Sequence, residues 1–172
     1  QQPSLAGVPG RPYRPAPAPP TTPLLARAMD AVAQQVGAPI LFGAQEYPET
    51  GGRYNVSLLW EPGTGVVDRY AKQHPAPFGE YIPLRSLLRV FSDQVDRVSI
   101  DMIAGTETGV VDLDASRLGR TVPLGVVICF EVAYDGLVND AVDAGAELLV
   151  VPPINASIGY TAESTQQLAM SR

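Results

Sequence analysis

The sequence predicts an α/β fold, and three consecutive patterns indicate it. The nearly continuous apolar run Val122–Glu131 is typical of a strand that is buried on both faces. A helical pattern follows at 135–145, and a second apolar strand follows at Glu147–Val151. Strand, helix and strand in this order form a right-handed βαβ unit with two parallel strands. We therefore expect Cys129 to lie at the carboxyl edge of the sheet, where the first strand gives way to the helix.

The first third of the chain changes from a proline-rich arm to a folded domain. Residues 1–23 are dense in proline, which lacks the N–H that helices and strands need, so we interpret them as an extended arm or linker. The folded domain is expected to span 24–172. It begins with a helix that Thr21 or Thr22 caps and Gly37 ends. The apolar face of this helix is expected to comprise Leu25, Ala28, Met29, Val32 and Val36.

Strand patterns follow this first helix. Pro39–Ala44 is expected to be one strand. Tyr54–Trp60 and Val66–Ala71 are expected to form a β-hairpin around the turn at 61–65. The hairpin leads directly into an irregular stretch rich in proline and aromatic residues.

The remaining elements are shorter. Leu84–Phe91 is expected to be a helix whose two arginines face water or a polar partner. Gly109–Leu113 is expected to be a strand, and Ala162–Arg172 a helix. Asp135 is expected to cap the helix of the βαβ unit. The buried face of that helix is expected to contain Leu137, Val138, Ala141 and Val142.

Composition and charge exclude several classes of protein. The formal net charge is −6 and no basic cluster is present, so we expect no nucleic-acid partner. One cysteine and one histidine, far apart in the chain, leave little material for a metal centre, and no cofactor is expected. No apolar stretch approaches the roughly 20 residues of a membrane-spanning helix. The sequence ends inside a helical pattern without a stop signal, so we expect it to be a piece of a longer protein.

Cys129 is the candidate nucleophile because it lies at the end of the central apolar run. A single buried cysteine is more often part of a core. Glu131, two residues later, would point to the same side of an extended chain, and a carboxylate beside a thiol is unusual in a core. The pair therefore favours a reactive site in which another group compensates the carboxylate.

Lys72 is the candidate cation for that site. It begins the loop 72–83, which combines prolines, aromatic residues and Glu80 in a composition typical of a fixed irregular segment. A lysine near Cys129 would favour the thiolate and stabilise an oxyanion, although most lysines are solvated surface charges. Glu80 would orient Lys72 by a charge-assisted hydrogen bond, or would pair with an arginine at the surface.

The loop 152–160, after the second parallel strand, would emerge at the same edge of the sheet as Cys129. Asn155 or Ser157 would then contact a substrate. The same residue types are common in plain turns, so both interpretations stay open.

Three motifs in these segments resemble the carbon–nitrogen hydrolase (nitrilase) superfamily, and within it the apolipoprotein N-acyltransferase family, over roughly residues 38–172. The lysine motif reads Tyr70-x-Lys72-x-His74-x-x-Pro77-Phe78-Gly79-Glu80-Tyr81-Ile82-Pro83. The nucleophile motif reads Gly125-x-x-Ile128-Cys129-Phe130-Glu131. The third motif reads Asn155-Ala156-x-x-Gly159 and then Gln166-Gln167-x-Ala169-Met170-x-Arg172. The lysine motif is the most specific, because ordinary soluble amidases of the superfamily lack the Pro-Phe-Gly-Glu-Tyr continuation.

The resemblance implies a nitrilase-type αββα sandwich, incomplete at both ends, in which 24–172 is a partial carbon–nitrogen hydrolase domain. It implies that Cys129 is the nucleophile and that Lys72 stabilises the tetrahedral oxyanion. The backbone N–H of Phe130 would be a second donor to that oxyanion. Supporting carboxylates and substrate-binding side chains are implied at Glu80, Glu131, Tyr81 and Asn155.

By the same resemblance, the reaction would be acyl transfer in two steps. The thiolate would take a fatty acyl group from a phospholipid as a thioester and pass it to the terminal amine of a lipoprotein's diacylglyceryl-cysteine. The domain would lie on the extracytoplasmic (periplasmic) side of the cell membrane, attached through membrane segments absent from this chain. The alternatives are a soluble carbon–nitrogen hydrolase that acts on small amides and a catalytically inactive fragment or interaction module.

The family's general base is a glutamate in a Pro-Glu pair at the end of a strand upstream of the first helix. That region is the proline-rich arm here, and Pro48-Glu49 is instead expected in a flexible loop. We therefore expect little turnover from the isolated chain, because proton transfer by a positioned base contributes roughly 100- to 10,000-fold.

Overall fold

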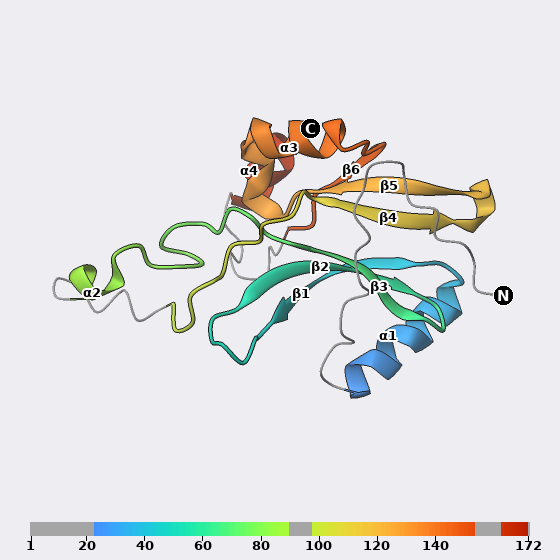
Figure 1. The fold of residues 1–172 in the computed structure, drawn as a ribbon, viewed down its shortest axis with the longest axis horizontal. Helices are drawn as coiled ribbons and strands as arrows, with labels where there is room; N and C mark the ends of the chain where they lie inside the picture. The colour runs from blue at the N-terminus through green and yellow to red at the C-terminus, as the bar shows by residue number, and fades with distance from the viewer. Residues whose placement is uncertain (1–22, 90–97, 154–162, 172) are drawn as a thin grey trace.

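The computed structural model describes residues 23–89, 98–153 and 163–171, and in these ranges the chain builds layers in the order α, β, β, α (Figure 1). In chain order the elements are α1 Pro23–Val36, β1 Ile40–Glu46, β2 Tyr54–Glu61, β3 Gly65–Ala71, α2 Arg85–Leu88, β4 Val110–Ala115, η2 Ser116–Leu118, β5 Arg120–Val126, η3 Cys129–Ala133, α3 Asp135–Asp143, β6 Leu148–Val150 and α4 Glu163–Met170. Helix α1 covers the sheet β1-β2-β3, the sheet β4-β5-β6 packs on its other side, and α3 and α4 lie beyond the second sheet. This order confirms the predicted sandwich.

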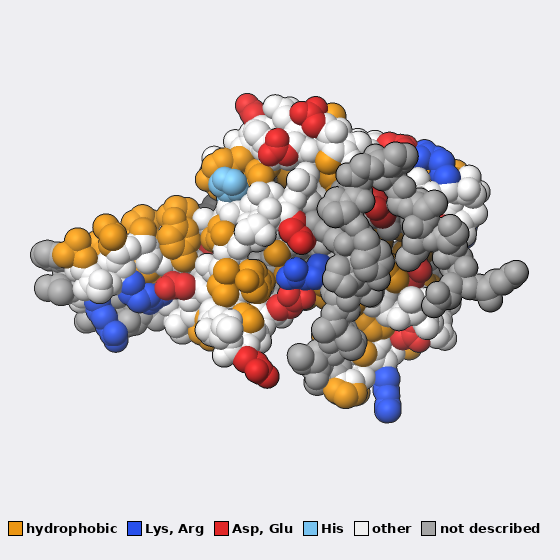
Figure 2. Space-filling model, viewed as in Figure 1, with side chains coloured by type: hydrophobic (Ala, Val, Ile, Leu, Met, Phe, Trp, Pro, Cys, Tyr) orange, Lys and Arg blue, Asp and Glu red, His pale blue; other side chains and the backbone are white. Residues whose placement is uncertain are grey.

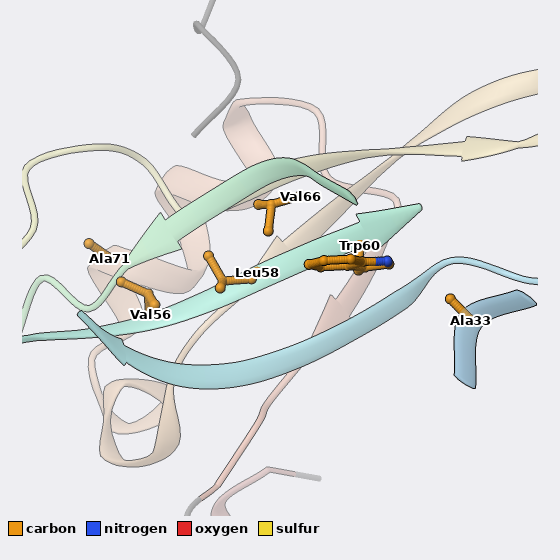
Figure 3. Close-up of a cluster of buried hydrophobic side chains, with 6 residues drawn as sticks. All are labelled: Ala33, Val56, Leu58, Trp60, Val66 and Ala71. Atoms are coloured by element: carbon orange, nitrogen blue, oxygen red, sulfur yellow. The ribbon is translucent and has the colours of Figure 1, made fainter. Parts of the chain in front are cut away.

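The first sheet is an antiparallel meander whose outer face packs on α1. β2 pairs with β1 and with β3, so the predicted hairpin is confirmed. Successive side chains of a strand point to opposite faces, and Val56, Leu58 and Trp60 of β2 lie in one buried cluster with Ala33 of α1 (Figure 3). The other face of β2 therefore points toward the second sheet.

The packing face of α1 differs from the predicted one. Ala33 is fully buried, and Ala26 and Met29 pack against the same cluster. Leu25 and Val32 are instead 45% and 48% exposed. Most of the predicted apolar face of the helix is exposed in the same way. The helix therefore contacts the sheet through Ala26, Met29 and Ala33. Val36 ends the helix and Gly37 adopts φ 66°, as predicted, whereas Thr21, Thr22 and the proline-rich arm at 1–22 lie outside the described residues.

The second sheet contains the predicted βαβ unit. β5 pairs in parallel with β6, α3 connects them, and β4 adds an antiparallel strand on the other side. Residues 123–126 are buried in an unbroken run, which confirms a strand covered on both faces. The predicted strand is nevertheless too long, because β5 ends at Val126 and a 3₁₀ helix, η3, begins at Cys129.

Two helices also differ from expectation in detail. Asp135 is the first residue of α3 and Tyr134 occupies the capping position, so Asp135 contributes negative charge to the first turn rather than a cap. Leu137 and Ala141 are the buried residues of α3, whereas Val142 is exposed, because the helix contacts the sheet along one narrow stripe. Helix α2 is shorter than predicted and spans four residues.

Residues 72–89 and 98–105 form a segment that projects from the sandwich at the left of Figure 1. Backbone hydrogen bonds fasten its two sides to each other and to the sheet: Gly105 N–H donates to Lys72 O at 2.7 Å, and Met102 N–H donates to Glu80 O at 2.9 Å. Arg85 finds the polar partner expected for it in Asp101. Figure 2 shows hydrophobic side chains gathered along one edge of this segment. Phe78, Leu84 and Leu87 of the segment are exposed.

Gly105 is required by the close approach of this segment to β3. A Cβ added there would lie 2.2 Å from the carbonyl oxygen of Ala71. We expect Gly105→Ala to lower the free energy of unfolding by about 2 kcal/mol or more, as overpacking does, measured by urea denaturation. Gly136→Ala in α3 is the control, because nothing lies within 4 Å of a Cβ at that position and alanine favours a helix by about 0.5 kcal/mol. Equal stability of the two variants would contradict the prediction.

Candidate active site

The ends of β3 and β5 bring two loops together at one end of the sandwich. Lys72 follows β3 directly, and Cys129 follows β5 after two further residues. Tyr70 from β3 lies in the buried cluster between the sheets together with Val126 and Ile128 from the β5 side. The loop that begins at Lys72 and the turn that begins at Cys129 are therefore neighbours, although they are far apart in the sequence.

Lys72 is a buried cation that is paired with Glu80. Its side chain is 1% exposed, and Nζ lies 2.7 Å from Glu80 Oε2 and 2.9 Å from Oε1. Glu80 accepts two further hydrogen bonds, from the Ala76 N–H at 2.6 Å and from Asn55 Nδ2 at 3.4 Å. A buried ammonium group requires a paired, hydrogen-bonded anion, and Glu80 supplies it. The sequence predicts either Lys72 or a surface arginine as the partner of Glu80, and in the structure the partner is Lys72.

Glu131 is a buried carboxylate held by four hydrogen-bond donors. It has no exposed surface. Its Oε1 accepts from the Tyr70 hydroxyl at 3.0 Å, the Gln73 N–H at 2.7 Å and the His74 N–H at 3.0 Å, and its Oε2 accepts from the Ile128 N–H at 2.7 Å. Three of these donors come from β3 and the loop after it, and the fourth precedes Cys129. The carboxylate therefore fastens the two loops to each other.

Cys129 has a strained backbone. Its φ is 56°, in the left-handed region, which costs a non-glycine residue about 1 to 2 kcal/mol. Its side chain is half-buried at the first position of η3. The predicted geometry, with Cys129 and Glu131 on one side of an extended strand, is wrong because the chain has already turned into η3. Glu131 points inward to its four donors, and its charge is compensated by those donors rather than by a cation.

Aromatic rings cover the outer side of the two loops. The His74 ring lies 4.5 Å from the Tyr134 ring at 38°, and the Phe130 ring meets Tyr134 edge-on at 5.8 Å. Phe130 is 43% exposed beside Cys129. Tyr81 is half-buried in the projecting segment and its carbonyl accepts the Phe78 N–H.

The remaining sequence-predicted groups are placed as follows. Asn155 and Ser157 lie outside the described residues. Glu49 is exposed in the turn between β1 and β2, so Pro48-Glu49 is a loop pair, as expected. In the described ranges there is no group of three or more His, Cys, Asp or Glu side chains that could hold a metal ion, and no helix there is long and apolar enough to span a membrane. The catalytic roles of Cys129 and Lys72 stay predictions.

Sequence reasoning missed Asn55 and Tyr70, which contact Glu80 and Glu131. The signal was present in β2, where Asn55 and Ser57 occupy alternate positions of a strand that is apolar from Leu58 to Trp60 and buried from Asn55 to Trp60. Two polar residues on one face of a buried strand predict a polar site on that face. Tyr70 belongs to the quoted lysine motif, but its hydrogen bond to Glu131 spans 61 positions of the chain.

The layers of the sandwich define the class of the protein as α/β, with a strained cysteine and a buried lysine–glutamate pair in two neighbouring loops. The family model for carbon–nitrogen hydrolases matches residues 6–172, and the chain belongs to that family. Within it, the chain is similar to the apolipoprotein N-acyltransferase of Mycolicibacterium smegmatis, with 37% identity over 145 residues. That alignment covers 81% of this chain and 23% of the relative.

A second relative gives the same name. The apolipoprotein N-acyltransferase of Geobacter metallireducens is 27% identical over 152 residues, which cover 87% of this chain and 28% of the relative. The chain therefore spans about a quarter of the length of these two relatives.

Solved structures share the fold at low sequence identity. An amidase from Nesterenkonia sp. superposes with a TM-score of 0.52 at 16% identity, covering 84% of this chain and 49% of the amidase. A mutant of that amidase, which carries the acetamide moiety of fluoroacetamide at its active-site cysteine, gives a TM-score of 0.51 at 17% identity over 83% of this chain and 48% of its own. These likenesses establish the fold.

The hydrogen bonds of Glu131 predict a large effect of removing its charge. In Glu131→Gln one acceptor oxygen becomes an NH₂ group that faces N–H donors. We expect the free energy of unfolding to fall by about 3 kcal/mol, measured by urea denaturation, with faster amide exchange at Gln73 and His74. Glu147→Gln is the matched control because Glu147 forms an exposed pair with Arg120; it should change neither measurement. A wild-type unfolding curve for Glu131→Gln would show that the four contacts contribute little.

Tyr70 predicts an alkaline loss of stability. Burial, and next the charge of Glu131, raise the pKa of Tyr70. The unfolded tyrosine ionises near pH 10, so the contribution of Tyr70 is complete below that pH and falls as the pH rises above it, by up to about 1.4 kcal/mol per pH unit. We expect the stability difference between wild type and Tyr70→Phe to be about 2 kcal/mol at pH 7 and to shrink above pH 10.

The check is a series of urea denaturation curves from pH 7 to 11. Tyr47→Phe is the control, because Tyr47 is 61% exposed and bonds only to the nearby Gln45 among the hydrogen bonds described for it; it should give a small difference that does not depend on pH. A constant difference for Tyr70→Phe over the same range would contradict the assignment.

Proposed function

We propose that this chain forms part of an acyltransferase active site that moves a fatty acyl group from a phospholipid to the N-terminal amine of a lipoprotein's diacylglyceryl-cysteine. Membership of the carbon–nitrogen hydrolase family and similarity to apolipoprotein N-acyltransferases support this reaction class. The observation that carries the proposal is the Glu131 carboxylate, which binds N–H groups from both the Lys72 loop and the Cys129 turn. That contact supports the proposal that the thiol of Cys129 and the ammonium group of Lys72 belong to one site.

In the first step the Cys129 thiolate attacks the ester carbonyl carbon of the phospholipid. The carbonyl oxygen becomes an oxyanion, toward which Lys72 and the backbone N–H of Phe130 are proposed to donate. Collapse of this intermediate leaves an acyl thioester on Cys129 and expels a lysophospholipid, whose leaving oxygen takes up, through the general base, the proton that the thiol lost. Glu80 holds the Lys72 ammonium group in position during this step through its hydrogen bonds to Nζ.

In the second step the acceptor amine attacks the thioester carbonyl. The same donors stabilise the second oxyanion, the amide bond forms and the Cys129 thiolate is released. The thiol proton of the first step and the amine proton of the second pass to a general base, for which no described residue shows the family's Pro-Glu pattern at a strand end. Tyr81 and Asn155 are proposed to contact the substrates.

A phospholipid donor and a lipoprotein acceptor place this reaction at the cell membrane. We propose that the domain lies at the extracytoplasmic face, where it meets both substrates. The exposed apolar side chains of the projecting segment lie on the same loop as Lys72 and Glu80, so this loop is suited to meet a lipid.

Acylation of Cys129 tests the proposal directly. The intact protein is incubated with a phospholipid of defined acyl chain, and the mass of the peptide that contains Cys129 is measured. We expect an adduct with the mass of that acyl group, released by neutral hydroxylamine because the bond is a thioester. Cys129→Ala should abolish the adduct, and Lys72→Met should slow its formation by about 100-fold or more, as loss of an oxyanion donor does.

Other outcomes would identify the alternatives. Hydrolysis of small amides without a lipid adduct would indicate a soluble carbon–nitrogen hydrolase. Neither adduct nor hydrolysis would indicate an inactive interaction module. An adduct that persists in Cys129→Ala would contradict the assignment of the nucleophile.

A further inference from the structure

Two buried polar side chains lie on the inner face of β2, next to the candidate site. Asn55 is 4% exposed and Ser57 is fully buried. Both point between the two sheets, because their neighbours Val56 and Leu58 pack toward α1. The paired positions on β3 bear Tyr70, opposite Ser57, and the residue that follows β3 is Lys72, whose N–H donates to the Asn55 carbonyl at 2.8 Å.

Each of the two side chains has an atom that receives no hydrogen bond in the described part of the chain. These atoms are Asn55 Oδ1 and Ser57 Oγ. A buried amide oxygen without a donor destabilises a fold, and an apolar side chain of the same size would remove that cost. The presence of asparagine at this position therefore calls for a compensating role.

The nitrogen of the Asn55 side-chain amide indicates that role. Nδ2 donates to Glu80 Oε1 at 3.4 Å, while both Glu80 oxygens hold Lys72 Nζ. Asn55 thus contacts Lys72 through its main chain and the partner of Lys72 through its side chain. Ser57, two residues away on the same face, has no such contact to the ion pair among the described hydrogen bonds.

We propose that Asn55 is a positioning residue that orients the Glu80 carboxylate and, through it, the ammonium group of Lys72. With Oε1 held by the Asn55 amide and Oε2 by the Ala76 N–H, the carboxylate plane is fixed. Its two oxygens then take two of the three Lys72 protons, and the third is left for the oxyanion formed at Cys129. This inference rests on the proposed function for the role of that third proton.

The proposed role predicts that replacing Asn55 lowers the reactivity of Cys129 without lowering the stability of the fold. Asn55→Leu keeps the branched shape and the number of side-chain heavy atoms, and it removes both the donor to Glu80 and the unpaired oxygen. We expect its melting temperature to equal or exceed the wild-type value. The rate of Cys129 alkylation by iodoacetamide, which reports the thiolate beside Lys72, should fall about 10-fold, as expected for loss of a hydrogen bond to a charged group. A residue with a purely structural role would lower both quantities together.

Two further variants keep the test decisive. Ser57→Ala is the matched control because it removes the other unpaired atom of the same strand face; its alkylation rate should equal the wild type's. Asn55→Asp places a carboxylate against Glu80, and the two acids then share a proton as the pH falls. We expect its alkylation rate, divided by that of wild type at each pH, to rise between pH 8 and pH 5.5, because the protonated Asp restores a donor to Glu80. This comparison does not need Asn55→Leu to fold.

The alkylation assay is run in parallel with phospholipid acylation of Cys129 on the same preparations of the intact protein. Slower alkylation in Asn55→Leu with an unchanged rate in Ser57→Ala supports the positioning role, whether or not wild type forms a thioester. Equal alkylation rates in wild type and Asn55→Leu overturn it. Absence of a lipid adduct in wild type counts against the proposed function alone.

Discussion

The hydrogen bonds of one buried carboxylate organise the end of this sandwich. Glu131 has no exposed surface, yet it accepts hydrogen bonds from β3, from the loop after β3 and from the backbone that enters η3. A buried carboxylate is tolerated only when its oxygens are satisfied, so the charge can stay in the interior only while the two loops stay together. The buried carboxylate of Glu131 is therefore satisfied only when the loop after β3 and the turn at Cys129 are folded against each other.

A second polar cluster lies on the Lys72 side and is kept separate from the first. Lys72 is buried with Glu80, and Asn55 and the Ala76 N–H complete the coordination of that carboxylate. Glu131 is satisfied by four hydrogen-bond donors, and Lys72 is paired with a different carboxylate. The two buried polar clusters therefore have separate partners, which suits the oxyanion role proposed for Lys72.

The strained positions of the described backbone lie in the projecting segment and at Cys129. Among the described residues, the non-glycine residues with positive φ are Phe78, Leu84 and Cys129. Two of them expose large apolar side chains on the projecting segment, and the third bears the thiol. Left-handed geometry at such residues persists only where surrounding contacts enforce it. Here those contacts include the backbone hydrogen bonds of the projecting segment and the hydrogen bond that the Ile128 N–H donates to Glu131.

Local patterns in the sequence determined the elements and most of their pairing. Alternating residues at 54–71 encode the hairpin, and the apolar run that ends near Cys129 encodes the central strand, because periodicity and burial act within a few residues of each other. The motifs also indicated Lys72 and Cys129. Only the tertiary structure decided that β5 stops at Val126, that α1 packs through Ala33, and that Glu131 turns inward while Asn55 reaches Glu80. Each of these depends on hydrogen bonds or close contacts between segments far apart in the chain, and no local pattern specifies which distant group will meet a given side chain.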